Sequence, residues 1–144
     1  MTPDVNVLVA ASRSDHPHHA VAREWLEAAP VDAELGATMK LQPMLVASFL
    51  RFVTNRKIFV HPTPVPEALG FIDALLSAPG VQQPALHDEW PALEALCIDK
   101  ALSANDVPDA WLAAADIQQA DHLVSFDADF KRLLPRALFT RLAV

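Results

Sequence analysis

The chain has 144 residues, of which 52% are hydrophobic and 20% are charged, and its formal net charge is −7. This length fits one domain, residues 1–144, with a core of its own, and the composition excludes a disordered chain. The single cysteine excludes an intrachain disulfide framework and a zinc site built from cysteines. The acidic balance argues against broad attraction to nucleic acid, unless the acids gather around a bound cation.

No targeting or membrane segment is expected. The sequence holds no uninterrupted run of about 18 apolar residues, the length that a membrane-spanning helix needs. Its start also lacks the basic segment and long apolar stretch of a secretory signal. We therefore expect a cytoplasmic protein that does not bind membranes.

The first eleven residues permit two interpretations. Val5, Val7 and Val9 are β-branched, and local propensity alone predicts one strand. Asn6 is also a good helix N-cap, so a very short strand could end at Asp4 and a helix could begin at Val7. The local pattern leaves both interpretations open.

Four helices are expected in the middle of the chain. Apolar residues recur at helical spacing over residues 17–29, 43–54, 66–77 and 89–102, with a short strand near residues 81–86 before the last of them. Pro43 and Pro66 suit a first helical turn, and Pro91 fits only near the start of its helix.

The last third of the chain completes an α/β pattern. An alanine-rich helix runs from Asp106, its expected N-cap, to about residue 120, with Asp109 in the first turn. The clearest strand, residues 122–126, leads directly into Asp127 and Asp129, and then come a short helix to residue 134 and a last strand over residues 137–142. Such alternation predicts a largely parallel sheet, whose ligands lie at the carboxyl ends of the strands.

Asp4, Asp109 and Asp127 are the acids that this arrangement can bring to one sheet edge. Carboxylates that lie close together repel each other, and oxygen ligands of this kind suit Mg²⁺ or Mn²⁺. Such an ion can orient a phosphodiester, lower the pKa of an attacking water and stabilise the departing oxygen. Each aspartate also has a structural interpretation, at a helix N-terminus or in a turn, so the spacing alone is a weak signal.

Four segments carry a family resemblance. Residues 3–10 (PDVNVLVA), 107–114 (VPDAWLAA) and 123–130 (LVSFDADF) resemble, in order, the signature blocks of PIN-domain toxins of the VapC type, and residues 48–55 (SFLRFVTN) resemble the second-helix segment of a VapC subgroup. The resemblance covers essentially the whole chain. It implies a PIN-like α/β fold with a five-stranded, largely parallel sheet flanked by helices, and a metal-dependent endoribonuclease site at the carboxyl edge.

Position by position, the resemblance implies that Asp4, Asp109 and Asp127 are the catalytic, metal-binding acids. It implies that Asn6 supports Asp4. It also implies that Asp129 is either an additional metal ligand or a residue that contacts the metal ligands without binding the metal itself. It also implies that the first strand ends at Asp4 and that a helix begins near Asn6, which favours the second interpretation of the start. Mg²⁺ is the expected cofactor, with Mn²⁺ as the alternative.

The resemblance implies partners as well. These are an RNA substrate, a second copy of the chain in a homodimer, and a VapB-type antitoxin in a type II toxin–antitoxin module. Basic side chains in the tail of such an antitoxin would satisfy the carboxylates in place of metal.

One position departs from the family pattern. Many PIN domains have a glutamate in the second-helix segment, where this chain has Ser48 and no acid anywhere in residues 39–59. We therefore expect a three-sided site, with water or Asp129 completing the coordination. The departure supports an alternative function, a PIN-fold module that binds RNA or a protein partner with weak or no catalysis.

Further residues are candidates for supporting roles. Asp106 is interpreted as a helix cap, with an outer carboxylate of the site as the alternative. Arg51, Arg56 and Lys57, with Arg13 nearby, form the densest basic patch and predict contacts with RNA phosphates, although a solvated helix end explains them equally well. A phosphatase or phosphotransferase with an aspartyl nucleophile is a third candidate function, which covalent phosphate on Asp4 would reveal.

Overall fold

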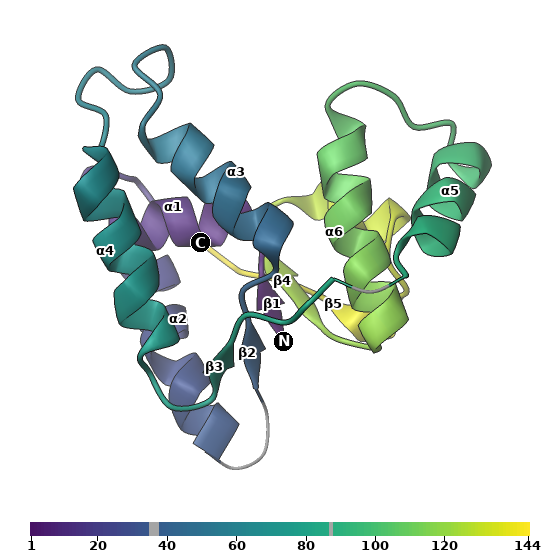
Figure 1. Cartoon of the computed structure of the whole chain (residues 1–144), viewed down its shortest axis with the longest axis horizontal. Helices are drawn as coiled ribbons and strands as arrows, with labels where there is room; N and C mark the ends of the chain where they lie inside the picture. The colour runs from purple at the N-terminus through teal and green to yellow at the C-terminus, as the bar shows by residue number, and fades with distance from the viewer. Residues whose placement is uncertain (35–37, 87) are drawn as a thin grey trace.

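The computed structural model describes residues 1–34, 38–86 and 88–144, with side chains in the second helix described up to Ala29. Figure 1 shows strands at the centre of the molecule with helices around them. The elements, in chain order, are β1 (Thr2–Pro3), α1 (Val5–Ser12), α2 (His19–Glu34), β2 (Met39–Lys40), α3 (Pro43–Val53), α4 (Val65–Leu76), β3 (Val81–Gln82), α5 (Trp90–Asp99), α6 (Asp106–Gln119), β4 (Leu123–Ser125), the 3₁₀ helices η1 (Ala128–Arg132) and η2 (Arg136–Leu138), and β5 (Phe139–Arg141).

All the strand pairs in the described ranges are parallel, as expected, but they form two pieces rather than one five-stranded sheet. One piece has the order β1-β4-β5, with Thr2 opposite Leu123, and the other pairs β2 with β3, with Met39 opposite Val81. A hydrogen bond of 2.8 Å from the Lys40 N–H to the Met1 carbonyl connects the two pieces.

Pro3 explains the division of the sheet. The Thr2 N–H donates to the His122 carbonyl just before β4 at 2.7 Å, and the Asp4 N–H donates to the Val124 carbonyl at 2.8 Å. The backbone nitrogen of residue 3 therefore faces the opposite side, toward β2. Proline has no N–H to donate there, and the ladder between β1 and β2 is correspondingly short. A proline in this strand is tolerated because its nitrogen faces away from β4.

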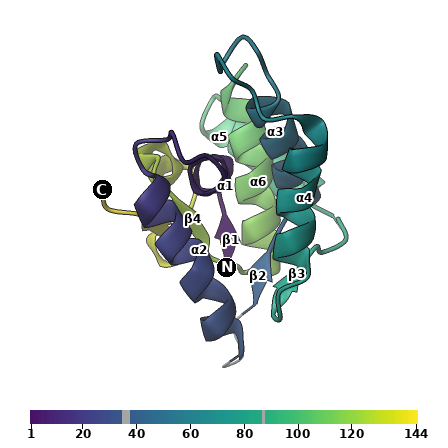
Figure 2. The ribbon, with the colours of Figure 1, turned by 90° about the vertical axis from the view of Figure 1, so that its left-hand side faces the viewer.

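Helix α1 lies at the centre of the core. It packs against α2 and α3, and its residues Val7, Leu8, Val9, Ala10 and Ala11 are all buried. A helix that is buried on all sides has a continuous run of apolar residues in its sequence. The same pattern is typical of a buried strand, so these residues fit both. Figure 2 shows α1 with α2 on one side and with α3 and α4 on the other.

Two details of the helix starts differ from the expectation. The cap of α1 is Asp4, and Asn6 lies inside the helix, because the Asp4 carboxylate accepts the Val5 N–H. Asp106 is the first residue of α6 rather than its cap, and Asn105 before it makes no side-chain cap. The Asp106 carboxylate instead pairs with Arg132 of η1 at 3.0 Å.

The remaining helices agree with the sequence pattern. Pro43, Pro66 and Pro91 each lie in the first turn of their helix, where a missing N–H costs nothing. Helix α5 packs on α6, and α3 also contacts α6. None of the helices in the described ranges combines the length and apolar character needed to cross a bilayer.

Candidate active site

Asp4 is held rigidly at the junction of β1 and α1. Its Oδ1 accepts the Val5 N–H at 2.7 Å, and its Oδ2 accepts the Ser125 hydroxyl at 2.8 Å. Asp4 is only 3% exposed. The position follows from the fold, because the parallel strands β1 and β4 end side by side and bring Ser125 next to Asp4.

Ser125, which the sequence analysis did not single out, connects the first and third acidic segments. Its oxygen accepts from the Asn6 amide at 3.0 Å and from the Asp127 N–H at 2.9 Å, while its hydroxyl donates to Asp4. The Phe126 N–H donates to the side-chain Oδ1 of Asn6 at 3.3 Å. The available signal was a serine in an apolar strand, since a buried hydroxyl needs hydrogen-bond partners.

Asp109 and Asp127 approach Asp4 from α6 and from the turn after β4. Asp109 lies in the first turn of α6 and is half-buried, whereas Asp127 caps η1 and is exposed. The Asp127 Oδ1 accepts the Asp129 N–H at 2.8 Å. Asp129 is exposed beside it.

The charges of these three segments act on one another. Burial is the largest cause that raises the pKa of Asp4, the hydrogen bonds from Ser125 and Val5 oppose it, and the carboxylates of Asp109 and Asp127 add to it, so that the pKa lies at about 7. Burial also raises the pKa of Asp109 to about 6, with added repulsion from Asp127. Both carboxyls therefore ionise incompletely near neutral pH, and a bound cation would reverse this effect.

Asp106 and Asp129 add to the negative charge around Asp109. Both raise the pKa of Asp109, while Arg132, the ion-pair partner of Asp106, lowers it. Asp106 thus lies at the outer edge of the acidic cluster, where its carboxylate accepts a hydrogen bond from the guanidinium of Arg132.

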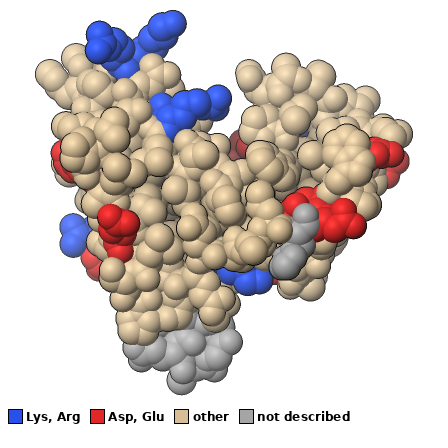
Figure 3. Space-filling view, viewed as in Figure 1, with Lys and Arg blue, Asp and Glu red and all other residues tan. Residues whose placement is uncertain are grey.

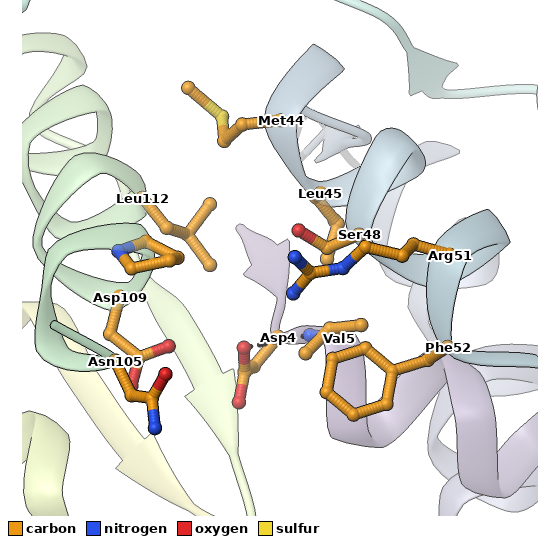
Figure 4. A pocket seen from close by; sticks show the side chains of 11 residues that line it. Asp4, Val5, Met44, Leu45, Ser48, Arg51, Phe52, Asn105, Asp109 and Leu112 are labelled. Atoms are coloured by element: carbon orange, nitrogen blue, oxygen red, sulfur yellow. Dashed lines mark hydrogen bonds between the residues drawn. The ribbon is translucent and has the colours of Figure 1, made fainter. Parts of the chain in front are cut away.

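Asp4 and Asp109 line a pocket of about 370 Å³ between α3 and α6, and neither Asp127 nor Asp129 is among its lining residues. Figure 4 shows the carboxylates of Asp4 and Asp109 turned toward each other, with Ser48 and Arg51 reaching in from α3. A second hollow of about 300 Å³ adjoins the pocket, because both are lined by Met44, Ser48, Arg51 and Pro108. Trp111 lines this second hollow.

The donor chemistry of the cluster fits a hard divalent cation, since it consists of carboxylate oxygens with an unbalanced negative charge. Within residues 1–34, 38–86 and 88–144, however, no three His, Cys, Asp or Glu side chains are arranged as a group that could hold a metal ion. The side chain of Asp127 is exposed, and its Oδ1 accepts the Asp129 N–H. Coordination by Asp4, Asp109 and Asp127 together therefore stays a prediction.

The four basic candidates separate into two kinds. Arg51, Arg56 and Lys57 are exposed on α3 and the loop after it, and Arg51 lines the pocket. Basic side chains stand out on this part of the surface in Figure 3.

Arg13 has a structural role instead of the predicted contact with RNA. It is 8% exposed, forms two hydrogen bonds with Asp15, and donates to the His61 carbonyl and the Thr63 hydroxyl. Its guanidinium also lies 3.9 Å from the centre of the Phe59 ring. With these contacts, the guanidinium joins α1 to the loop before α4 and is not available to a phosphate.

Comparisons with known proteins agree with this geometry. The family model described as the PIN domain matches residues 1–133. The chain is 39% identical over 138 residues to Ribonuclease VapC25 of Mycobacterium tuberculosis, covering 90% of this chain and 89% of that protein. It is 40% identical over 133 residues to Ribonuclease VapC31 of the same species, with the same coverage.

A solved structure shares the fold. It is that of VapBC2 from Rickettsia felis bound to a DNA fragment from its promoter, with a TM-score of 0.70 and 16% identity over 99% of this chain and 98% of that one. The predicted PIN-like α/β fold is thereby confirmed. The chain belongs to the PIN domain family and, within it, to the VapC group.

Proposed function

We propose that this chain is a metal-dependent endoribonuclease that acts as the toxin of a type II toxin–antitoxin pair. The observation that carries the proposal is that Asp4 and Asp109 line one pocket between α3 and α6. The effect of Asp127, whose charge raises the pKa of both carboxyls, supports a place for it beside them. The relatives at about 40% identity are named ribonucleases, which supports hydrolysis of RNA.

Asp4, Asp109 and Asp127 would hold the divalent cation, Mg²⁺ or Mn²⁺, with Asp129 as a further candidate. When bound, the cation supplies charge neutralisation and lowers the pKa of an attacking water. Asn6 donates to Ser125, and Ser125 donates to the Asp4 carboxylate, so the Asp4 oxygens need no reorganisation when substrate arrives. In the overall reaction, the water oxygen bonds to phosphorus, the bond from phosphorus to the 3′ oxygen breaks, and the 3′ oxygen receives a proton.

The proposed partners follow from the same cluster. A VapB-type antitoxin with basic side chains would neutralise the acids in place of a cation and block the pocket between α3 and α6. The resemblance to a VapB–VapC complex supports this partner. We further propose that residues 1–144 act as a single domain, in the cytoplasm, as a homodimer.

The test is cleavage of RNA by the purified chain. Structured RNAs, including tRNA and ribosomal RNA fragments, are incubated with Mg²⁺, with Mn²⁺ and with EDTA, and product ends are mapped. We expect cleavage only with metal, and a loss of about 10²-fold or more with Asp4→Asn or Asp109→Asn. Asp73→Asn, an exposed carboxylate change on α4, is the matched control.

A binding module without turnover is the second candidate. It is favoured by Ser48, which leaves α3 without an acid, and by the lack of a ready metal group among the described residues. Retention of RNA or partner affinity without products, in any of the metals, would establish it. The phosphatase alternative is disfavoured, since Asp4 is buried and both of its oxygens accept hydrogen bonds.

A further inference from the structure

Arg51 holds a distinctive place in the cleft. It lies in the last turn of α3 and lines both the acidic pocket and the adjoining hollow. Among the described residues that line these two hollows, it is the one positively charged side chain. Figure 4 shows its guanidinium directed into the pocket, on the wall opposite Asp109.

The guanidinium of Arg51 has no polar partner within the described part of the chain. Its recorded contact is with the Phe52 ring, whose centre is 5.7 Å away. Arg13 and Arg132, by contrast, are engaged with carboxylates. The donors of Arg51 are thus available to a ligand, and an arginine has five of them in a planar fork.

The helical neighbours of Arg51 do not neutralise it either. The residues three and four positions away on α3 and just beyond it are all uncharged, namely Ala47, Ser48, Thr54 and Asn55. An acid at position 48 would lie on the same helix face and could pair with Arg51. With Ser48 there, the charge stays free and faces the acids without an ion pair to Asp4 or Asp109.

We propose that Arg51 binds a non-bridging oxygen of the RNA phosphate that is cut, and that it is a catalytic residue of this chain. The assignment rests on the proposed ribonuclease function. A phosphodiester that enters between α3 and α6 meets carboxylates on one side, which require a cation, and Arg51 on the other. The planar guanidinium can donate two N–H bonds to a phosphate, an arrangement that a lysine cannot reproduce.

The contact is stronger in the transition state than with bound substrate. Negative charge grows on the phosphoryl oxygens as water attacks, and a fixed cation in a partly water-excluded pocket stabilises it. Loss of Arg51 therefore lowers the rate of the chemical step as well as RNA affinity. A purely electrostatic surface contact would lower affinity alone.

The experiment compares Arg51→Gln and Arg51→Lys with the wild type. Arg23→Gln on α2 is the control, because it also removes one exposed positive charge, with only a surface ion pair to Glu27. RNA affinity is measured in EDTA by fluorescence anisotropy over a range of salt concentrations. The cleavage rate is measured in Mg²⁺ under single-turnover conditions with saturating enzyme, and thermal unfolding verifies that each variant is folded.

With Arg51→Gln, we expect the rate at saturation to fall about 10²-fold and the slope of log affinity against log salt to decrease by about 0.7. Arg51→Lys should recover the slope but not the full rate, whereas Arg23→Gln should change neither. If the wild type cuts RNA and Arg51→Gln cuts it equally fast at saturation, the Arg51 assignment is wrong and the ribonuclease proposal stands. If the wild type cuts no RNA, the ribonuclease proposal fails first.

Discussion

Replacing Asp4 with asparagine should stabilise the protein while lowering its proposed ribonuclease activity about 10²-fold or more. The Asp4 carboxyl has a pKa of about 7 in the folded chain against 3.8 as its ordinary value. Because the folded pKa is raised, ionisation opposes folding, and stability falls as pH rises from about 4 to above 7. At pH 8 this difference amounts to about 4 kcal/mol, at about 1.4 kcal/mol for each pKa unit.

The asparagine removes this cost but weakens a hydrogen bond. The Ser125 oxygen already accepts from Asn6 and Asp127, so it cannot easily accept from a new amide as well. We assign about 1–2 kcal/mol to that loss. The net gain at pH 8 is then about 2 kcal/mol, or roughly 6 °C in Tm for a chain of this size.

The assay is thermal unfolding in EDTA at pH 8 and pH 5. At pH 5 the cost of ionisation is only about 1–2 kcal/mol, which the weakened hydrogen bond offsets, so the variant and the wild type should melt at nearly the same temperature. The exposed Asp73→Asn change should alter stability by less than about 0.5 kcal/mol at both values. The reasoning would be refuted by an Asp4→Asn variant that is less stable than the wild type at pH 8, or by one whose Tm differs from that of the wild type by the same amount at both pH values.

Three further predictions concern residues around the site. Asp116 is fully buried, its Oδ2 has no hydrogen-bond partner among the described residues, and burial raises its pKa to about 7, so its ionisation opposes folding as pH rises. In urea unfolding, the stability of Asp116→Asn relative to the wild type should therefore increase between pH 4 and pH 8, and a difference in stability that does not change with pH would contradict this. Ser125→Ala removes the donor to the Asp4 Oδ2 and should cost about 1–3 kcal/mol in the same assay, whereas an unchanged midpoint would show that the network is not needed. Arg13→Met should cost about 2 kcal/mol or more, because it leaves the His61 carbonyl and the Thr63 hydroxyl without their donor, and a neutral effect would return Arg13 to the candidates for RNA contact.

The start of the chain shows how far local pattern carries a prediction. Val5, Val7 and Val9 favour a strand by propensity, yet they form the buried helix α1. Tertiary contacts decide between helix and strand. One carboxylate oxygen of Asp4 accepts the Val5 N–H, and the other accepts the Ser125 hydroxyl. The family resemblance predicted the helix correctly, whereas the local interpretation of Asn6 as its N-cap was wrong, because Asn6 lies inside α1 and its side chain contacts Ser125 and Phe126.

The sequence indicates the candidate acids of the site but not the residues that position them. Asp4, Asp109 and Asp127 each follow a strand or open a helix, which is a signal that sequence spacing carries. Ser125 and the unpaired state of Arg51 depend on which strands and helices become neighbours, as does the loss of Arg13 from the basic patch. These contacts link residues far apart in sequence, so periodicity cannot reveal them.

Calorimetric titration of Mn²⁺ into the wild-type chain and the Asp109→Asn variant, at pH 6.5 in two buffers of different ionisation enthalpy, tests the central claim most directly. We expect the wild type to bind Mn²⁺ and to release protons, since Asp4 and Asp109 have pKa values of about 7 and 6 and must ionise to act as ligands. The variant should bind more weakly and release fewer protons. A wild type that binds no Mn²⁺, or a variant that binds it equally well, would contradict a shared cation at this cluster.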